Sequence, residues 1–313
     1  MYKIGIDMMG GDYAPTQAAL GVQAYLLQQV TGTCIYAIGD ATILNTLLPN
    51  LNPTHCVIVP SHSVIAMKEH PTKAFKEKQD SSIAIGFKML KEGTIDAFIS
   101  AGNTGAMLVG THFSIKTIPG VLRPAIGAVF PRLDGSTGLL CDVGLNADCK
   151  PEHLNQFAVL GSAFAHTMLQ QHKPTVGLLN IGEEEGKGNQ LAQDSYALLK
   201  QNPSIHFIGN IEGRDVYDSK ATVMVCDGFT GNIVLKMAEQ LYEIAQQRNI
   251  KDDFLDKCHF ETYGGSPLLG VSKPVIIGHG ISQQKAFVNM ITLAAKMLET
   301  NVLGNIENSF KAI

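Results

Sequence analysis

A turn rich in glycine and polar residues joins a short apolar run to a helical pattern at residues 223–236. After Val-Met-Val-Cys at residues 223–226, the sequence continues as Asp-Gly-Phe-Thr-Gly-Asn. A tight turn before a helix needs glycine, because its backbone adopts positive φ and leaves amides uncovered by a side chain. Free N–H groups at a helix start carry the positive end of the helix dipole and favour an anion. Thr230 and Asn232 add side-chain donors and Lys236 can reach back, so this segment predicts an anion-binding turn.

Other segments carry residues with similar chemistry. Residues 100–105 read Ser-Ala-Gly-Asn-Thr-Gly and predict a second glycine turn before a helix. Lys187 stands between two glycines, where its ammonium can reach an oxyanion or remain an ordinary surface lysine. His279 also stands between glycines, as a donor or acid–base group or as a simple turn histidine. These turns are therefore candidates for one shared anion site.

The elements that position these turns are short apolar strands alternating with helical patterns. We expect strands at residues 4–7, 34–38, 56–59, 97–99, 126–130, 138–141, 176–179, 205–208, 223–226 and 275–277. The pair 126–130 and 138–141 flanks Asp134-Gly135 and predicts a hairpin. The alternation is typical of a mainly parallel sheet covered by helices on both faces. Ligands bind such sheets at the carboxyl ends of the strands, where the glycine-rich turns fall.

Two stretches lack this regular pattern. Residues 67–79 are charged and irregular, which favours a solvated surface or a docking surface for an acidic partner. Residues from about 248 to 267 also show no clear element. Residues 209–213, Gly-Asn-Ile-Glu-Gly, are predicted to form the loop after strand 205–208.

Composition limits the classes of protein that this chain can belong to. Its 313 residues suit two lobes or one large α/β unit, and 45% hydrophobic against 17% charged residues gives ample core material. A net charge of −4 gives no reason to expect nucleic acid. The six cysteines are scattered, so we expect reduced thiols in a cytosolic protein. The first residues already form a strand, so no secretion signal is expected, and no apolar run approaches the roughly 20 residues that span a membrane.

Several familiar catalytic motifs are absent or imperfect. No G-x-G-x-x-G follows the first strand and no G-x-S-x-G occurs, which disfavours a nicotinamide dehydrogenase and a serine hydrolase. Residues 182–188 resemble a phosphate-binding loop, but three consecutive glutamates would repel a triphosphate. Cys226 is a possible nucleophile, although a core cysteine is the commoner case. Asp7, Asp12, Asp142 and Asp227 have no spacing that demands a metal, so we expect neither metal nor cofactor.

Motifs from the first strand to the last helix together resemble one known family, the phosphate acyltransferases of bacterial phospholipid synthesis (the PlsX family). The motifs lie at residues 9–12, 100–106, 123–125, 149–154, 178–183, 209–213, 226–232, 263–270 and 278–280. The resemblance implies a three-layer α/β/α fold with a mainly parallel sheet, like isocitrate and isopropylmalate dehydrogenases. It also implies one catalytic unit over residues 1–313, with two lobes around a shared cleft, and a homodimer.

The resemblance further implies transfer of a fatty acyl group from acyl carrier protein to inorganic phosphate, giving acyl phosphate. The implied location is the cytoplasm, with peripheral contact at the inner face of the membrane and no role for nucleic acid. Residues 248–262 are fewer than is usual in the family, in a region where helices for dimer packing and membrane contact are expected. A coenzyme A-dependent phosphate acyltransferase and a non-catalytic acyl- or phosphate-binding scaffold remain the alternatives.

This reaction needs positioning more than proton chemistry, because phosphate is already an anion and a thiol with pKa near ~8.5 leaves readily as thiolate. We assign phosphate to the 227–232 turn and Lys187, with Asn103 and Thr104 facing them, and Asp227 orienting a donor. His279 or Asn210 would donate to the thioester carbonyl or assist the thiolate. The candidate catalytic residues are thus Lys187, Asn232, Asn103, His279 and Asp227, and the candidate substrate-binding residues are Gly102, Thr104, Gly105, Arg123, Asn210, Thr230, Gly231 and Lys236.

Overall fold

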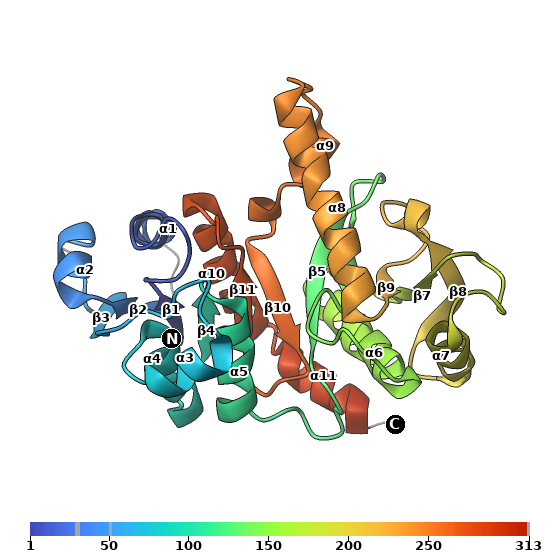
Figure 1. The fold of residues 1–313 in the computed structure, drawn as a ribbon, viewed down its shortest axis with the longest axis horizontal. Coiled ribbons are helices and arrows are strands. Elements are labelled where there is room, and N and C mark those ends of the chain that lie inside the picture. The colour runs from blue at the N-terminus through green and yellow to red at the C-terminus, as the bar shows by residue number, and fades with distance from the viewer. Residues whose placement is uncertain (29–31, 50–51, 312–313) are drawn as a thin grey trace. The chain divides into compact units, whose positions relative to one another are not determined.

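The structure, a computed structural model, describes residues 1–28, 32–49 and 52–311 (Figure 1). The chain divides into two compact units, which we call unit 1 and unit 2. Unit 1 comprises Met1–Lys116, Phe260–Pro267 and Ser272–Glu299, and unit 2 comprises Thr117–His259, Leu268–Val271 and Thr300–Ile313. Both are built from several chain segments, so sequence neighbours near residues 260–272 belong to different units.

The sheet of unit 1 is parallel except at one edge. Its strands are β1 (Tyr2–Asp7), β2 (Thr33–Gly39), β3 (Cys56–Pro60), β4 (Ala97–Ser100), β11 (Val275–Gly278) and the first residues of β10 (Gly265–Leu269). The order is β3-β2-β1-β4-β11-β10, with only β10 antiparallel to its neighbour. Ile4, Ile6 and Ile35 are fully buried, as expected of strands covered on both faces.

Helices cover both faces of this sheet (Figure 1). They are α1 (Thr16–Leu27), α2 (Ala41–Leu47), α3 (Pro71–Glu77), α4 (Ser82–Glu92), α5 (Thr104–Ser114) and α10 (Gln284–Glu299), with a 3-10 turn η2 (Phe260–Thr262). α1 packs against α10, and α4 packs against α5. The prediction that residues 67–79 are irregular is wrong in part, because Pro71 begins α3. The fixed φ of proline suits this first helical position.

The sheet of unit 2 combines a hairpin with a parallel set. Its strands are β5 (Ala125–Pro131), β6 (Thr137–Cys141), β7 (Thr175–Asn180), β8 (His206–Glu212), β9 (Val223–Val225) and the last residues of β10. β5 and β6 pair antiparallel around Asp134-Gly135, so the predicted hairpin is confirmed. The parallel order is β6-β9-β7-β8, and β10 pairs antiparallel with β5.

Strand β8 is longer than the sequence suggested. The predicted loop 209–213 continues the strand as far as Glu212, because Gly209 adopts φ +101° and absorbs a register irregularity against β7. Asn210 therefore lies in a strand. The segment Gly265–Leu269 is likewise a strand, whereas the sequence showed no clear element as far as Pro267.

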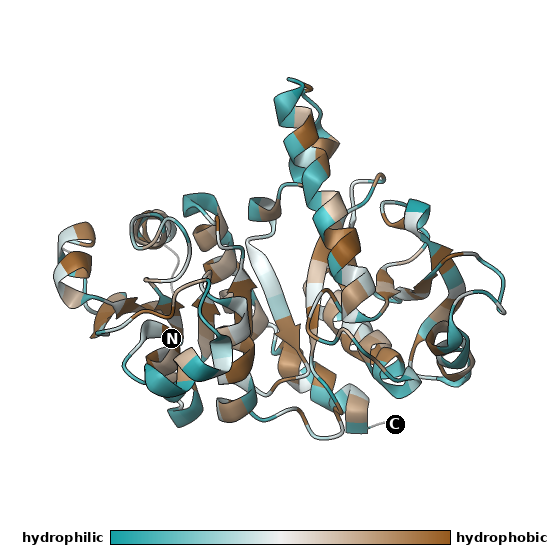
Figure 2. Ribbon diagram, in the orientation of Figure 1, coloured by the Kyte–Doolittle hydropathy of each residue, from teal (hydrophilic) through white to brown (hydrophobic). Residues whose placement is uncertain are grey.

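The helices of unit 2 differ in how deeply they are packed. They are α6 (Pro151–Met168), α7 (Gln190–Gln201), α8 (Gly228–Gln247), α9 (Asp253–Lys257) and α11 (Val302–Lys311), with a 3-10 turn η1 (Gly213–Asp215). α6 is the central helix, with Phe157, Leu160 and Phe164 fully buried. α8 is 20 residues long but buries only Gly228, Gly231 and Ala245. Figure 2 shows hydrophobic bands along this exposed helix.

The expected class, a mainly parallel α/β fold in three layers, is confirmed. Among the described helices, none combines the length and apolar character needed to cross a membrane.

Candidate functional site

The predicted site residues fall into both units. Gly102, Asn103, Thr104, Gly105 and His279 belong to unit 1, and Arg123, Lys187, Asn210, Asp227, Thr230, Gly231, Asn232 and Lys236 belong to unit 2.

In unit 2, a buried carboxylate organises the loops around the start of α8. Asp142, at the end of β6, is completely buried and accepts hydrogen bonds from the backbone N–H groups of Ile126 (2.8 Å) and Asn146 (2.6 Å). The side-chain amide of Asn146 donates to the same carboxylate at 2.9 Å. Burial raises the pKa of Asp142, and these hydrogen bonds oppose the rise. The sequence indicated only that Asp142 has no spacing that demands a metal, and it did not reveal this anchoring role.

The start of α8 packs against this loop without space for side chains. A Cβ on Gly231 would overlap the backbone carbonyl of Asp142, and one on Gly228 would lie 2.8 Å from the Asp142 carboxylate. Gly231 is therefore a packing residue rather than a direct ligand of substrate. This close approach explains both glycines of the turn.

The first turn of α8 uses most of its own donors. Asp227 is the N-cap, and its carboxylate accepts from the backbone N–H (2.8 Å) and the hydroxyl (2.9 Å) of Thr230. The N–H of Gly228 donates to the carbonyl of Asn146 at 2.7 Å. Within the described chain only the N–H of Phe229 in this turn lacks an acceptor. The backbone N–H groups that were predicted to bind an anion are thus mostly hydrogen-bonded within the protein. The turn presents side-chain donors instead.

Asn232 is the main side-chain donor that the turn presents. It is exposed, and one amide hydrogen reaches the carbonyl of Val143 at 3.2 Å, which leaves the second hydrogen available. Gly144, with φ +137°, faces this amide closely, and a Cβ there would lie 3.1 Å from Asn232 Nδ2. The loop thereby holds Asn232 in place while its outer side stays open.

Lys187 is the second open donor of unit 2. Asn180 Nδ2 donates to the carbonyl of Lys187 at 3.1 Å, and the N–H of Lys187 donates to Glu184 at 3.0 Å. The aliphatic stem of Lys187 passes over Gly182, where a Cβ would lie 3.0 Å from Lys187 Cγ. No ion pair of the Lys187 ammonium occurs among the described residues, and the side chain is exposed.

Two of the three neighbouring glutamates pair with other lysines. Glu183 pairs with Lys220 at 2.5 Å, and Glu185 pairs with Lys200 at 2.9 Å. The hydrogen bond that Lys220 donates to the Glu183 carboxylate raises the pKa of Lys220. Asn210 is buried, and its amide donates to the carbonyl of Glu184 at 2.8 Å, so in this structure it supports the Lys187 loop.

A cavity of about 430 Å³ brings the two donor segments together. It is lined on one side by Ile181 and Gly188, which bracket the Lys187 loop, and on the other by Asp227, Thr230 and Val234 of the α8 start. Lys187 and Asn232 therefore belong to segments that border one cavity within unit 2.

The remaining unit 2 candidates are engaged elsewhere. Arg123 is exposed and donates to the carbonyl of Asp148 at 3.1 Å, while the Lys236 ammonium contacts Glu239 at 2.6 Å. Cys226 is buried, and burial raises the pKa of its thiol well above the ordinary value. It therefore fits the interpretation as a core cysteine rather than a nucleophile.

Unit 1 contains a comparable loop cluster around Asp7. This carboxylate is fully buried and accepts from Ser100 Oγ at 2.6 Å and from the N–H of Met9 at 3.0 Å. Burial raises its pKa. Gly102 is buried, and its N–H donates to Ser100 Oγ at 2.9 Å.

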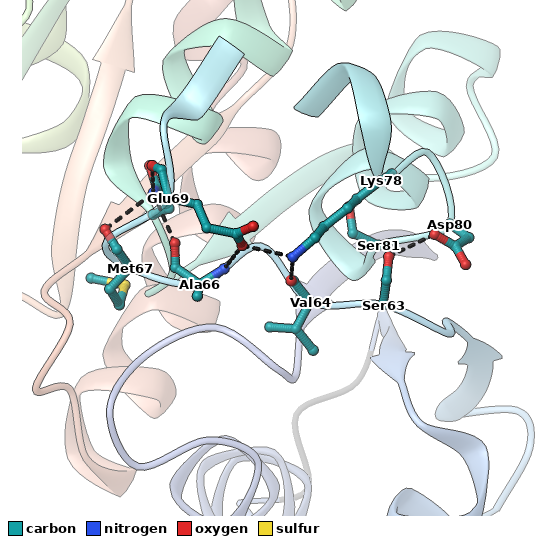
Figure 3. A network of polar contacts seen from close by, with 9 residues as sticks. Ser63, Val64, Ala66, Met67, Glu69, Lys78, Asp80 and Ser81 are labelled. Carbon is teal, nitrogen blue, oxygen red and sulfur yellow. Dashed lines mark hydrogen bonds and ion pairs between the residues drawn. The ribbon is translucent and has the colours of Figure 1, made fainter. Parts of the chain in front are cut away.

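Asn103 connects this cluster to residues 63–69. Its Oδ1 caps α5 by accepting from Ala106 N–H at 2.9 Å. Its amide donates to the carbonyls of Ala66 (3.0 Å), Met67 (3.2 Å) and Glu69 (3.1 Å). In the same segment Glu69 accepts from Lys78 and from Ala66 N–H (Figure 3). The donors that the sequence assigned to phosphate therefore hold a loop in this structure.

The other unit 1 candidates stay accessible to different extents. Thr104 is exposed, and within the described chain neither its N–H nor that of Gly105 has an acceptor. A Cβ on Gly105 would lie 2.8 Å from Pro71, so this glycine permits α5 to approach α3. His279 is half-buried, stacks near Phe260 with ring centroids 5.0 Å apart, and its Nδ1 accepts from Ile281 N–H at 3.4 Å.

Among the described residues, no group of three or more His, Cys, Asp or Glu side chains is arranged to hold a metal ion. Unit 2 thus has three donors that are open within the described chain: the Lys187 ammonium, one amide hydrogen of Asn232 and the N–H of Phe229. They belong to the two segments that border the cavity, although none of the three residues lines it. Such donors can bind an anion and stabilise a developing oxyanion.

Comparison with known proteins gives consistent results. The family model described as "Fatty acid synthesis protein" matches residues 2–305. A phosphate acyltransferase from Dictyoglomus turgidum is 40% identical over 96% of this chain and 95% of its own length, and one from Nostoc sp. is 39% identical over 99% and 97%. Among solved structures, a phosphotransacetylase from Streptococcus pyogenes has the same fold, with TM-score 0.67 and 18% identity over 95% of this chain and 93% of its own.

Proposed function

Because the chain belongs to the fatty acid synthesis protein family, whose relatives are phosphate acyltransferases, we propose that it moves a fatty acyl group from acyl carrier protein to inorganic phosphate. The product would be an acyl phosphate for phospholipid synthesis in the cytoplasm. The observation that carries this proposal, beside family membership, is the pair of open donors, Lys187 and Asn232, on segments that border one cavity.

The proposed reaction is a direct displacement. An oxygen of HPO₄²⁻ attacks the thioester carbonyl carbon, the new C–O bond forms, and the C–S bond breaks. The phosphate proton ends on the departing thiolate, so acyl phosphate and a free thiol result. The buried Cys226 has no part in this route, because its raised pKa keeps it a thiol.

This reaction has two anionic centres, the phosphate and the oxyanion that develops at the thioester carbonyl, and Lys187 and Asn232 would bind them. The Lys187 ammonium attracts phosphate. The loop at Val143 and Gly144 holds the Asn232 amide, so that its second hydrogen can be donated to a substrate oxygen. Preorganised donors of this kind each supply about 3–4 kcal/mol of transition-state stabilisation. Asp227 acts indirectly by capping α8, since its carboxylate is already used by Thr230 and would repel phosphate.

The homodimer implied by the resemblance is part of the proposal, and α8 is its candidate interface. Phe229 (63% exposed), Ile233 (49%), Met237 (70%) and Ile244 (43%) form an apolar set on a helix that its own unit barely covers. Burial of such side chains against a second copy is favourable by about 1.5–3 kcal/mol each. Light scattering should give the mass of two chains, and Met237→Glu should give one; a wild-type monomer would contradict the dimer.

Peripheral contact with the inner membrane face is a further expectation from the resemblance. Flotation with anionic phospholipid vesicles tests it, with Met237→Glu in parallel. A wild-type chain that stays with the soluble fraction at low salt would refute membrane contact and leave the acyl transfer proposal unaffected.

The proposed reaction is tested with purified chain, phosphate, and acyl groups carried either on acyl carrier protein or on coenzyme A. Acyl phosphate is followed by mass spectrometry, with and without a chelator. Product from the carrier-protein thioester, insensitive to chelator, is the expected result. Product from coenzyme A thioesters alone would instead identify a coenzyme A-dependent enzyme, and no product from either would indicate a non-catalytic scaffold.

A further inference from the structure

We propose that the cavity of unit 2 holds the aliphatic chain of the acyl group. This inference rests on the proposed function and specifies where the acyl chain binds. The volume of about 430 Å³ falls within the roughly 300–1,000 Å³ usual for small-molecule pockets. The sequence alone indicates no position for an acyl channel.

The wall of the cavity is mostly apolar. Its apolar lining residues are Leu154, Leu178, Leu179, Ile181, Leu191, Ala192, Cys226 and Val234. Leu154 and Leu178 are almost fully buried, so they form its floor. Among the lining residues no lysine or arginine occurs, and Asp227 is the one charged side chain. An anionic ligand is therefore disfavoured inside the cavity.

The polar side chains on the wall are already hydrogen-bonded within the protein. Asn180 donates to Lys187 and accepts from Ile181 N–H at 2.8 Å. Asn189 caps α7 by accepting from Ala192 N–H at 2.9 Å. Asp227 and Thr230 satisfy one another. Because most of these polar groups are already paired, the wall offers little to a sugar, a nucleotide or a carboxylate, whereas an uncharged hydrocarbon loses nothing by entering it.

The location agrees with the reaction geometry. A thioester carbonyl held between the Lys187 loop and the α8 start would have the mouth of the cavity beside it. The chain can then pass between α7 and α8, while phosphate stays at the donors. Each buried methylene contributes about 0.8 kcal/mol, so kcat/KM should rise about fourfold per added carbon until the cavity is filled.

Gly213 allows this inference to be tested with little disturbance of the fold. It lines the cavity, and a Cβ placed on it would meet no atom within 4 Å, so a larger side chain has room to enter. In the variant Gly213→Leu the added side chain occupies space that we assign to the acyl chain. Ala192→Leu, at the first turn of α7, is a second variant that narrows the same cavity.

The measurement is kcat/KM for acyl donors of two to sixteen carbons in the wild type, both cavity variants, and the control Ala197→Leu on the exposed side of α7. For long donors we expect Gly213→Leu to lower kcat/KM about tenfold or more, equivalent to losing burial of about two methylene groups. Activity on the two-carbon donor should be unchanged, and Ala197→Leu should match the wild type throughout.

Two outcomes would overturn the inference and leave the proposed function intact. One is an unchanged chain-length profile in both cavity variants. The other is an equal loss for short and long donors. If the wild type makes no acyl phosphate from any donor, the proposed function itself fails, so the two failures are distinguishable. Circular dichroism and thermal unfolding establish that each variant is folded.

Discussion

Units 1 and 2 fix a glycine-rich helix start in the same way, but they differ in the hydrogen-bond donors that stay open. In each, a completely buried aspartate at a strand end, Asp7 or Asp142, fixes the loops beside a glycine-rich helix start. In each, burial raises the pKa of that carboxyl. The two helices, α5 and α8, also have N-caps, Asn103 and Asp227, that accept from their own first turns.

The difference lies in which donors remain. In unit 1, the amide of Asn103 donates to three carbonyls, and the backbone N–H groups of Thr104 and Gly105 are open within the described chain. In unit 2, the N–H of Gly228 at the helix start donates to a carbonyl, whereas the Lys187 ammonium and one amide hydrogen of Asn232 are open within the described chain. Two sequence segments that look alike therefore differ in structure: the open donors are mainly side chains in unit 2 and backbone N–H groups in unit 1.

Removing the Lys187 ammonium should have the largest effect. Loss of a preorganised charged donor costs about 10³ in turnover, so Lys187→Ala should lower kcat by about that factor. Its thermal midpoint should stay within about 1 °C of the wild type, because surface substitutions usually change stability by under ~0.5 kcal/mol. Lys200→Ala, a lysine paired with Glu185 nearby, is the matched control and should retain activity. Normal turnover in Lys187→Ala would place the chemistry elsewhere.

Asn232→Ala should follow, with kcat lowered about 10² because one amide donor is lost. Stability should hardly change, since Asn232 is exposed and makes one 3.2 Å contact to Val143. Asn232→Asp keeps the size of the side chain but repels phosphate, and it should be at least as impaired. The decisive comparison is activity per folded molecule, measured after unfolding curves are recorded. Full activity in both variants would remove Asn232 from the site.

Asn103, the asparagine of the glycine-rich turn in unit 1, should behave in the opposite way. Asn103→Ala removes a helix cap, worth about 1 kcal/mol, and the hydrogen bonds to the partly exposed carbonyls of residues 66, 67 and 69, each worth about 0.5–1.5 kcal/mol. We expect the free energy of unfolding to fall by about 2–4 kcal/mol in denaturant titrations. Asn103→Ser keeps the cap and should recover about 1 kcal/mol of that loss. If Asn103→Ala unfolds like the wild type and yet abolishes turnover, then Asn103 is a substrate contact and the contrast between the units is wrong.

Much of the fold followed from the sequence because its signals are local. Apolar runs ended by glycine predicted most strands, and the hairpin at Asp134-Gly135 is confirmed. The errors arose where a local signal was misleading. Gly209 suggested a loop although a positive φ lets β8 continue, and the stretch ending at Pro267 showed no clear pattern although it contains the start of β10. The charges around α3 concealed a helix that begins at Pro71.

The site was predicted only as far as residue type allows. Glycine-rich turns indicated where donors gather, and both Lys187 and Asn232 lie beside the cavity segments. Sequence could not show that Asn103 and Asn210 direct their amides at backbone carbonyls, since those partners are 26 to 37 residues away. Nor could it show that Asp142 anchors the α8 start, because its partners come from β5 and from its own loop.

The smallest effect concerns the backbone donors of α5. Thr104 is the first residue of this helix, a position where proline is well tolerated, so Thr104→Pro removes one open N–H without breaking the helix. A hydrogen bond to a charged group is worth about 1.5–3 kcal/mol, and we expect KM for phosphate to rise about tenfold. Thr104→Ala removes only the hydroxyl and should change KM less than about threefold. Equal KM values in the proline, alanine and wild-type chains, with unchanged unfolding curves, would show that the open amides of unit 1 do not serve the substrate, and that the donors of unit 2 act without them.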